Sequence, residues 1–543
     1  MPGAKRWSYC AALIALAGLA FFIGIGAIGL AGPDEPRYAE VAREMFASGD
    51  YISPRLCGCL WFEKPPLLYW LAAVAYHAFG VGEFAARAPS ALAAAGGALF
   101  LFHAVTKTVS VRLGAAVSLV LMTMAIFIGY GRAATPDMLL TASITISLCA
   151  AHIAGGVTAR ARVGYLVISG AAAGMAVLSK GLVGILLIGA VLAVAWLITR
   201  RWVFRPGDII LTAVVFLAVC SSWYLPVTMR HGWEFVREFF INHHVKRYLT
   251  NEYHHPEPIY FYLAVALAGA LPWTLYLASA IGRLRKLRFR GANARDYLLA
   301  LAWIWFLIPI LFFSFSVSKL PGYILPSFPA LSLIVGNEIE RFLNGERSAV
   351  MTVCAWLTSA LLLVLAAAFL IYLHRELGSG ALAPELLRLA PLVIAAGSMF
   401  FLLRNSRRQF IASSAAFTIS IVLVSIALLP PRLSSKISLR DLSVKTAASL
   451  RAGERIAFYL DKEYAPVFYA EGRVVCGVGE GDVLNAYSPE EIVDAVAREG
   501  SVVVITYIRK AGDLESDARL STEPIAVQGS EMAMRVGASK PVR

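Results

Sequence analysis

Residues 182–199 read LVGILLIGAVLAVAWLIT, a run without a single charged side chain. A helix needs about 20 mainly apolar residues to cross the roughly 30 Å hydrocarbon core of a bilayer. Lys180 precedes this run, and Arg200 and Arg201 follow it. Cations at both ends are typical of a helix anchored at two membrane interfaces. The stretch therefore predicts a transmembrane helix.

Comparable apolar segments recur from residue 11 to residue 428 of this 543-residue chain. With 58% hydrophobic and 15% charged residues, the composition indicates an α-helical polytopic membrane protein. We expect thirteen spans, near residues 11–30, 86–106, 113–130, 138–155, 163–178, 182–199, 208–227, 258–282, 297–316, 321–338, 349–373, 387–403 and 409–428. The first is expected to be a retained span, because no clear small-residue cleavage site follows it.

Lys and Arg predict the orientation of these helices, because positive loop residues are retained on the cytoplasmic side. With the N-terminus inside, twenty cations fall in seven short inside loops, six of them between Arg283 and Arg295. The net charge of +14 is then explained by topology and by the anionic lipid surface, and we expect contacts with membrane lipids but no nucleic-acid partner.

The apolar pattern ends at residues 428–431, and a mixed composition with short β-branched runs follows. We expect residues 1–430 to form a transmembrane domain and residues 431–543 a soluble α/β domain, which an odd number of spans places outside. In the second domain, the predicted strands are residues 455–460, 465–470 and 501–507, and the predicted helix is residues 489–498.

Two long outer loops, residues 31–85 and 229–257, interrupt the transmembrane domain. Residues 34–47 place apolar side chains at helical spacing, and a second such stripe begins at Val236. Both stripes predict amphipathic helices along the membrane interface. Cys57-Gly-Cys59 lies in the first loop, where a bridge across one residue would be strained.

Charged and phenolic residues gather at the outer ends of the predicted spans. They are the acids Asp34, Glu63 and Asp137, the cations Arg37, Lys64, Lys180, Arg247 and Lys319, and the phenols Tyr38 and Tyr323. Taken singly, Asp34 is explained as a helix cap and each cation as an interfacial anchor. Their recurrence on one face favours a site for a phosphate-bearing lipid, where cations neutralise a departing phosphate and carboxylates orient a sugar.

A divalent metal such as zinc is a weaker hypothesis, with Glu63, His243 and His244 as its ligands. Adjacent histidines on a helix do not usually reach one ion, and no His-x3-His or CxxC spacing is present. For His254 and His255 we favour a role in ordering their loop. No cofactor is therefore treated as required. The chain also has no GxxxxGK[ST] or GxGxxG motif, which disfavours ATP-driven transport.

Four motifs resemble those of the GT-C fold glycosyltransferases that use lipid-phosphate sugars, in their protein mannosyltransferase-like branch. They are Asp34-Glu35, FEKPPLLYW at residues 62–70, ATPD at residues 134–137 and SKLPGYILP at residues 318–326. Within this branch the chain is most similar to the bacterial 4-amino-4-deoxy-L-arabinose (aminoarabinose) transferase family. The resemblance extends over the whole chain.

The resemblance implies a bacterial inner-membrane enzyme that moves aminoarabinose from undecaprenyl phosphate to lipid A phosphates at the periplasmic face, conferring polymyxin resistance. It implies that Asp34 is the essential first-loop acid, that Asp137 is a second acid, and that Lys64 beside Glu63 contacts the carrier phosphate. It further implies phosphate contacts for Arg247 and Tyr323. Because a lipid A phosphate is already anionic, we expect Asp34 to position or stabilise charge instead of acting as a general base.

Two alternatives remain open. An enzyme of the same architecture can transfer mannose from a polyprenyl phosphate to a protein hydroxyl. A non-enzymatic flippase for lipid-linked sugars also needs many spans, but it would be expected to carry charges inside the bundle.

Overall fold

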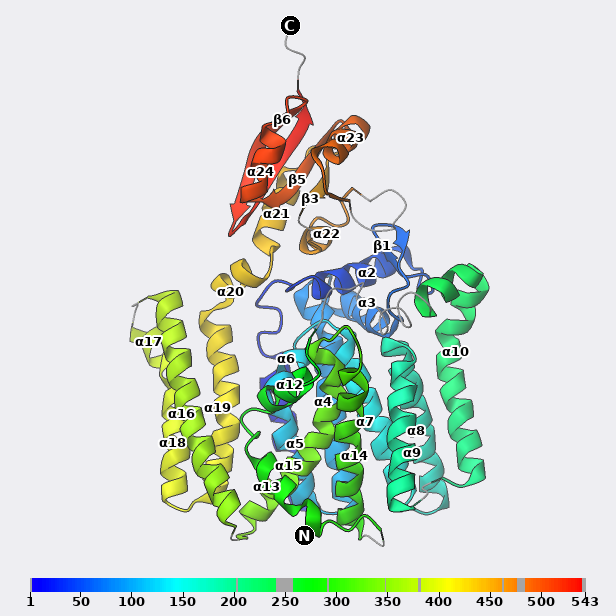
Figure 1. The fold of residues 1–543 in the computed structure, drawn as a ribbon, viewed down its shortest axis with the longest axis vertical. Helices are drawn as coiled ribbons and strands as arrows, with labels where there is room; N and C mark the ends of the chain where they lie inside the picture. Colours follow the sequence, from blue (N-terminus) through cyan, green and yellow to red (C-terminus); the bar gives the residue numbers. More distant parts are fainter. Residues whose placement is uncertain are drawn as a thin grey trace. The chain divides into compact units, whose positions relative to one another are not determined.

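The computed structural model describes residues 2–201, 204–240, 257–290, 293–346, 348–378, 382–460, 463–475 and 484–539. The chain forms two compact units (Figure 1). The bundle unit comprises Met1–Ile23, Glu63–Leu67 and Ser90–Leu428, and the sheet unit comprises Gly24–Phe62, Leu68–Pro89 and Leu429–Arg543. Two segments of the first predicted loop thus group with the C-terminal region.

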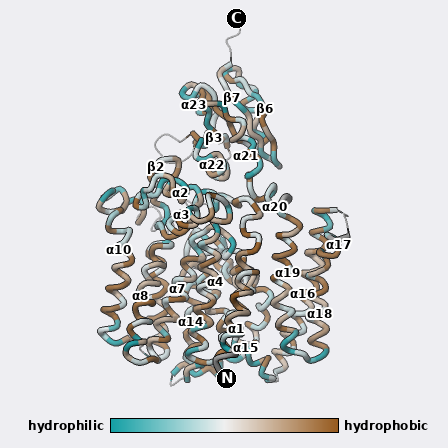
Figure 2. The backbone as a smooth tube through the Cα atoms, turned by 180° about the vertical axis from the view of Figure 1, so that it is seen from behind, coloured by the Kyte–Doolittle hydropathy of each residue, from teal (hydrophilic) through white to brown (hydrophobic). Residues whose placement is uncertain are grey.

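The bundle unit is built from helices in each of the thirteen predicted ranges, and one of these helices, α4, begins in the sheet unit and belongs to the bundle unit from Ser90 onward. Their bounds are α1 (Pro2–Ala17) with η1 (Gly18–Phe22), α4 (Glu83–Thr108), α5 (Val111–Met122), α6 (Ala125–Gly131), α7 (Pro136–Ala154), α8 (Ala159–Lys180), α9 (Val183–Thr199), α10 (Pro206–Val236), α12 (Phe261–Gly269), α13 (Tyr276–Arg283), η3 (Leu284–Lys286), α14 (Ala294–Ser314), η4 (Pro321–Ser327), α15 (Phe328–Leu343), α16 (Ala349–Leu377), α17 (Leu382–Arg388), α18 (Ala390–Leu403) and α19 (Arg407–Leu428). Figure 2 shows their apolar middles and more hydrophilic ends.

Seven helices of the described residues are long and apolar enough to cross a membrane, or eight if the bent pair α5 and α6 is one span. That pair bends by 69°. The predicted span at residues 258–282 is divided into the short helices α12 and α13, and the one at residues 321–338 begins with the 3-10 helix η4. The polytopic helical class is confirmed, whereas the number thirteen stays a prediction.

The core of the bundle lies around α7, because 83% of the apolar window in this helix is buried, and α7 packs against α8 and α9. By contrast only 6% of the apolar window in α10 is buried. A helix that is apolar and so little covered presents its side chains to lipid. Helix α7 is therefore enclosed by its neighbours, which bears on the site described below.

The sheet unit contains a five-stranded sheet with strand order β4-β3-β5-β7-β6. Its strands are β3 (Arg455–Tyr459), β4 (Asn485–Ala486), β5 (Ser501–Tyr507), β6 (Leu520–Gln528) and β7 (Glu531–Ala538). Strand β3 is parallel to β4 and β5, and β7 is antiparallel to β5 and β6. The helices that accompany these strands are α20 (Pro430–Ile437), α21 (Arg440–Ser449), α22 (Ala465–Tyr469), α23 (Pro489–Glu499) and α24 (Ile508–Glu515).

The predicted strands at 455–460 and 501–507 and the predicted helix at 489–498 are confirmed. The predicted strand at 465–470 is wrong, because this segment forms α22. Pro466 occupies its first turn, where a proline favours a helix start. So short an apolar run does not distinguish a strand from a buried helical turn.

The first predicted loop is also structured within the sheet unit. It holds α2 (Asp34–Ser48), the hairpin β1 (Arg55–Leu56) and β2 (Cys59–Leu60), and most of α3 (Leu67–Phe79). Tyr38, Val41, Ala42 and Met45 are buried along one side of α2, which confirms the helix and its apolar stripe. Its position along the membrane interface stays a prediction. The carboxylate of Glu44 accepts hydrogen bonds from the backbone N–H groups of Cys57 and Gly58 and so fixes the hairpin turn.

Candidate functional site

Asp137, Lys180 and Tyr323 form one cluster in the bundle unit, although 43 and 143 residues separate them in sequence. Lys180 Nζ lies 2.5 Å from Asp137 Oδ1, and the two side chains are only 15% and 13% exposed. The same ammonium lies 4.7 Å from the centroid of the Tyr323 ring, at a cation–π distance. The structure thus brings together three of the predicted site residues.

The local sequence places Asp137 at the start of α7 and Lys180 at the end of α8. Pro136 begins α7, so Asp137 lies in the first helical turn, where a negative charge interacts favourably with the helix dipole. Helix α8 ends at Lys180, because Gly181 adopts φ +78° and breaks the helix. A cation in the last turn is favourable for the same reason.

Gly322 on η4 allows the cluster to pack closely. A Cβ atom at this position would lie 2.8 Å from Asp137 Oδ1 and 2.7 Å from the Tyr130 hydroxyl. At such distances a side chain here would force the Asp137 carboxylate and the Tyr130 ring to shift, so Gly322 permits η4 to approach the acid. Tyr130 sits near the end of the short helix α6, and the sequence analysis missed it because no motif marks this residue.

Glu63 and Lys64 form a second desolvated pair in the bundle unit. Lys64 Nζ donates to Glu63 Oε1 at 2.8 Å, and the side chains are 10% and 6% exposed. Their contact, buried on both sides, restricts the directions in which the two side chains point. Lys319, in contrast, donates to the backbone carbonyl of Glu257 at 2.9 Å. This hydrogen bond ties Lys319 to the chain segment that precedes α12.

Asp34, Arg37 and Tyr38 lie together at the start of α2 in the sheet unit. Arg37 Nη2 lies 2.5 Å from Asp34 Oδ1, and the Asp34 side chain is 47% exposed. The Arg37 guanidinium is surrounded by aromatic rings, at 5.1, 5.7 and 5.3 Å from the centroids of Tyr38, Trp61 and Tyr464. Cation–π contacts hold the guanidinium in place, while Asp34 stays open to an incoming group.

The helix-cap explanation of Asp34 does not match the structure, because the N-cap residue is Pro33 and no side-chain cap is formed. Glu35, in the first turn of α2, instead binds the segment before the helix, since its Oε2 accepts the backbone N–H of Ala31 at 2.8 Å. Glu35 is in turn held by Arg87, whose Nε and Nη2 donate to its two carboxylate oxygens at 2.9 and 2.6 Å. Both residues are 5% exposed.

Arg87 extends this contact into a network within the sheet unit. Its guanidinium also donates to the carbonyls of Ile25, Ile28 and Gly29 at 2.8, 2.7 and 2.9 Å. The network fixes the segment that leads into Asp34 and so positions that acid. The sequence analysis did not select Arg87, although a charged residue at the edge of an apolar run was the available signal.

The metal hypothesis and one phosphate contact lie partly outside the described residues, because His243, His244 and Arg247 fall there, as do His254 and His255. Within the described ranges, no group of three or more His, Cys, Asp or Glu side chains is arranged to hold a metal ion. The third hypothetical ligand, Glu63, is paired with Lys64. The zinc site therefore stays a prediction.

The sequence of this chain is similar to those of known proteins. Residues 63–225 match the family described as dolichyl-phosphate-mannose-protein mannosyltransferase. An undecaprenyl phosphate-alpha-4-amino-4-deoxy-L-arabinose arabinosyl transferase of Pseudomonas fluorescens is 30% identical, over 70% of this chain and 67% of that protein. One of Edwardsiella ictaluri is 33% identical, over 59% of this chain and 57% of that protein, which is less than two thirds of its length.

A solved structure is similar to this chain over almost its whole length. The chain is similar to the crystal structure of ArnT from Cupriavidus metallidurans bound to undecaprenyl phosphate, with a TM-score of 0.79 and 26% sequence identity. The similarity covers 97% of this chain and 98% of that protein. The helical bundle and the sheet-containing region are thus both represented in one known architecture.

Proposed function

Because this chain belongs to the family of undecaprenyl phosphate-alpha-4-amino-4-deoxy-L-arabinose arabinosyl transferases, we propose that it transfers aminoarabinose from undecaprenyl phosphate to a phosphate of lipid A. The chain is a multi-pass membrane glycosyltransferase of the GT-C fold. Undecaprenyl phosphate is the ligand in the similar ArnT structure, which supports the donor. Lipid A as acceptor, the bacterial inner membrane as location and a periplasmic site rest on the family and on the distribution of positive loop residues.

The observation that carries the proposal is the Asp137–Lys180–Tyr323 cluster. In the proposed reaction, an oxygen of the acceptor phosphate forms a bond to C1 of the sugar. The bond from C1 to the carrier phosphate breaks, and undecaprenyl phosphate leaves with the electron pair. A developing phosphate charge needs cations that are already in place. Lys180 meets this need, since Asp137 and the Tyr323 ring fix its ammonium.

Glu63 and Lys64 are proposed to act in the same way on the carrier phosphate. Glu63 orients Lys64, and the ammonium has three N–H donors, so it can bind a phosphate oxygen without leaving Glu63. Lys319 and Arg247 are proposed as further contacts to phosphate. The first of them would keep one hydrogen bond to the Glu257 carbonyl.

Asp34 is proposed to receive the ammonium group of the aminoarabinose. Its side chain is the most open of the three predicted acids, at 47% exposed against 13% for Asp137 and 6% for Glu63. An exposed carboxylate beside a fixed arginine can take a second cationic partner. Arg37 and Tyr38 are proposed to define the direction in which Asp34 points.

The test is transfer by the purified full-length protein, with undecaprenyl-phosphate aminoarabinose and lipid A in detergent. Mass spectrometry should detect lipid A carrying aminoarabinose. A flippase would yield no product. Because residues 63–225 match the mannosyltransferase family, a parallel arm supplies polyprenyl-phosphate mannose and a Ser/Thr peptide, and a product there alone would replace the proposal. Each arm is run with and without a chelator to test the metal hypothesis.

A further inference from the structure

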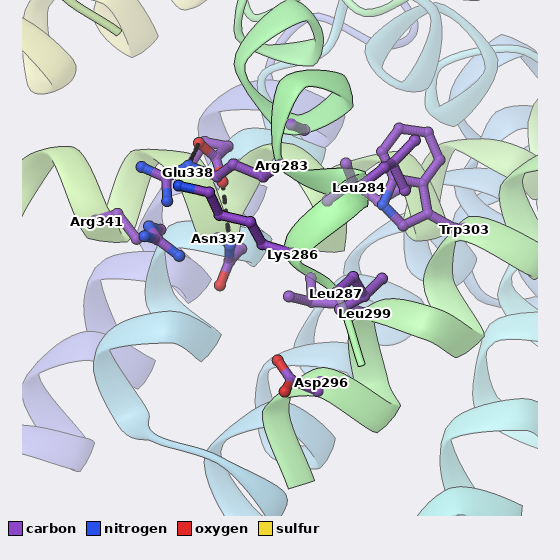
Figure 3. Close-up of a pocket in the computed structure, with 12 residues that line it drawn as sticks. Arg283, Leu284, Lys286, Leu287, Asp296, Leu299, Trp303, Asn337, Glu338 and Arg341 are labelled. Atoms are coloured by element: carbon purple, nitrogen blue, oxygen red, sulfur yellow. Dashed lines mark hydrogen bonds and ion pairs between the residues drawn. The ribbon is translucent and has the colours of Figure 1, made fainter. Parts of the chain in front are cut away.

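A polar pocket opens at the end of the bundle that lies away from Asp137. It has a volume of about 200 Å³ and lies between α13, η3, α14 and α15 (Figure 3). Tyr323 on η4 precedes α15, whereas the pocket is lined by residues of the last turns of α15, such as Arg341. Arg341 follows Phe328 by thirteen residues in α15, which separates the two places by about 20 Å along the helix axis.

One wall of this pocket carries two fixed guanidinium groups. Arg283 pairs with Glu338 at 3.1 Å and with Glu346 at 2.5 Å, and Arg341 pairs with Glu346 at 2.6 Å. Hydrogen bonds from Arg341 and Arg283 outweigh the effect of burial and lower the pKa of Glu346 to about 2. These acids hold the two arginines in place and leave further N–H groups of each guanidinium for a ligand.

Lys286 lies beside them without an ion pair anywhere in the described part of the chain. The acids that could compensate it, Glu338 and Glu346, already serve Arg283 and Arg341. Asp296, which also lines the pocket, hydrogen-bonds Asn293 at the start of α14 and forms no ion pair with these cations. Figure 3 shows Asp296 apart from the cationic wall. The pocket therefore has one cation in excess at that wall.

The opposite wall is apolar and is formed by Leu284, Leu287, Leu299 and Trp303. A free inorganic anion has no apolar surface that could pack against such a wall. An amphiphile with a phosphate and acyl chains matches both sides of the pocket, and basic pockets between transmembrane helices are known to suit anionic headgroups. The surrounding loop adds further exposed cations, Arg285 and Arg288.

We propose that this pocket binds the phosphodiester of an anionic membrane phospholipid, with Lys286, Arg283 and Arg341 on the phosphate and Trp303 along the glycerol and acyl region. The ligand is separate from the sugar donor and from the acceptor. Neither Lys286 nor Trp303 belongs to the machinery proposed for transfer, so this proposal does not depend on the proposed function.

Native mass spectrometry of the full-length protein in detergent tests the pocket with phosphatidylglycerol as the probe. In micelles no charged bilayer surface is present, so a retained lipid reports a site. Lys286→Gln should weaken binding about fivefold, the effect of one lost cation. The matched control Arg288→Gln removes an exposed cation of the same loop that does not line the pocket, and it should change binding less than twofold. Asp296→Asn should strengthen binding, because it removes the opposing charge.

Several results would overturn the proposal. Equal weakening by Lys286→Gln and Arg288→Gln would mean general attraction only, and no weakening by either would mean that the pocket is not used. Weaker binding in Asp296→Asn would indicate recognition of a cationic headgroup. Equal retention of zwitterionic phosphatidylcholine would mean that the pocket does not select an anionic lipid. Displacement of the lipid by millimolar inorganic phosphate would indicate a free-anion site.

Discussion

The Asp137–Lys180 pair allows a double-mutant cycle that asks whether the two residues act as one device. Asp137→Asn removes the charge of the acid, and Lys180→Met removes that of the base while keeping much of its length. If Asp137 works by holding Lys180, each single change should lower transfer strongly. The double variant should then be little worse than the poorer single variant.

The size of the coupling follows from the geometry. Two unit charges about 4 Å apart at an effective dielectric constant near 20 interact by about 4 kcal/mol. Because the side chains are 13% and 15% exposed, solvent screening reduces this value, and we expect about 2 kcal/mol. At 1.4 kcal/mol per tenfold change, each single variant should lose about 30-fold in kcat/KM. The double variant should lose far less than the product of about 900-fold.

The assay is the reconstituted transfer reaction, with equal amounts of monodisperse protein for the four members of the cycle. The Arg162–Asp208 pair is a matched control, because it joins α8 to α10 in the same unit and its side chains are 10% and 13% exposed. Asp208→Asn should reduce thermal stability but leave kcat/KM within about twofold. Additive losses in the Asp137 and Lys180 cycle would refute the reasoning and would give Asp137 an independent contact with the sugar.

Three further outcomes are expected. Gly322→Ala should lower transfer at least about tenfold, since the added methyl group would push against Asp137 and Tyr130. The control Gly164→Ala on α8, where nothing lies within 4 Å of the added Cβ, should leave transfer unchanged. Equal activity of the two variants would contradict the packing argument. Arg87→Lys should cost about 3 kcal/mol of stability, because lysine cannot reproduce the bidentate contact to Glu35 and the three carbonyl contacts; an unchanged unfolding temperature would show that the network is not needed. Burial would raise the pKa of Glu454, but hydrogen bonds from Arg535, the Arg451 backbone and Ser501 lower this pKa below its ordinary value. The ionised Glu454 carboxylate therefore stabilises the folded state above about pH 4.5, and this stabilisation is lost as the pH falls through the lower folded-state pKa. Hydrogen exchange of residues 501–507 in the full chain should therefore be faster in Glu454→Gln than in wild type at pH 7, with a smaller difference at pH 4; a difference that grows on acidification would contradict the sign.

The chemistry of Asp137, Lys180 and Tyr323 was predictable to the extent that each stands at one end of a predicted span. Hydropathy and positive loop residues assign such positions to a face of the membrane, but they give no lateral distances. The contact between Lys180 and Tyr323 depends on how α8 packs beside η4. That packing is a tertiary property and leaves no periodic trace in the sequence.

Other parts were hidden for different reasons. Arg87 stands at the edge of an apolar run and its partner Glu35 lies 52 residues earlier, so no local sequence pattern predicts their ion pair. Strands β6 and β7 have mixed composition, and only their pairing with each other and with β5 makes them a hairpin. In α22, the apolar run of five residues suits a strand as well as a helix, and Pro466 was the signal that should have decided the matter.

Because the chain bends sharply between α5 and α6, the length of α6 determines where its last residues point, and hydropathy does not show this. After the bend, α6 has only seven residues, and its hydroxyl-bearing Tyr130 stands one residue from the end. Each residue of an α-helix turns the side-chain direction by about 100°. One residue inserted into α6 or deleted from it would swing Tyr130 away from Gly322, even if every apolar residue were retained. This two-turn segment therefore works as a spacer of fixed length, so natural or designed variants should tolerate exchange of its apolar residues far better than any change in their number.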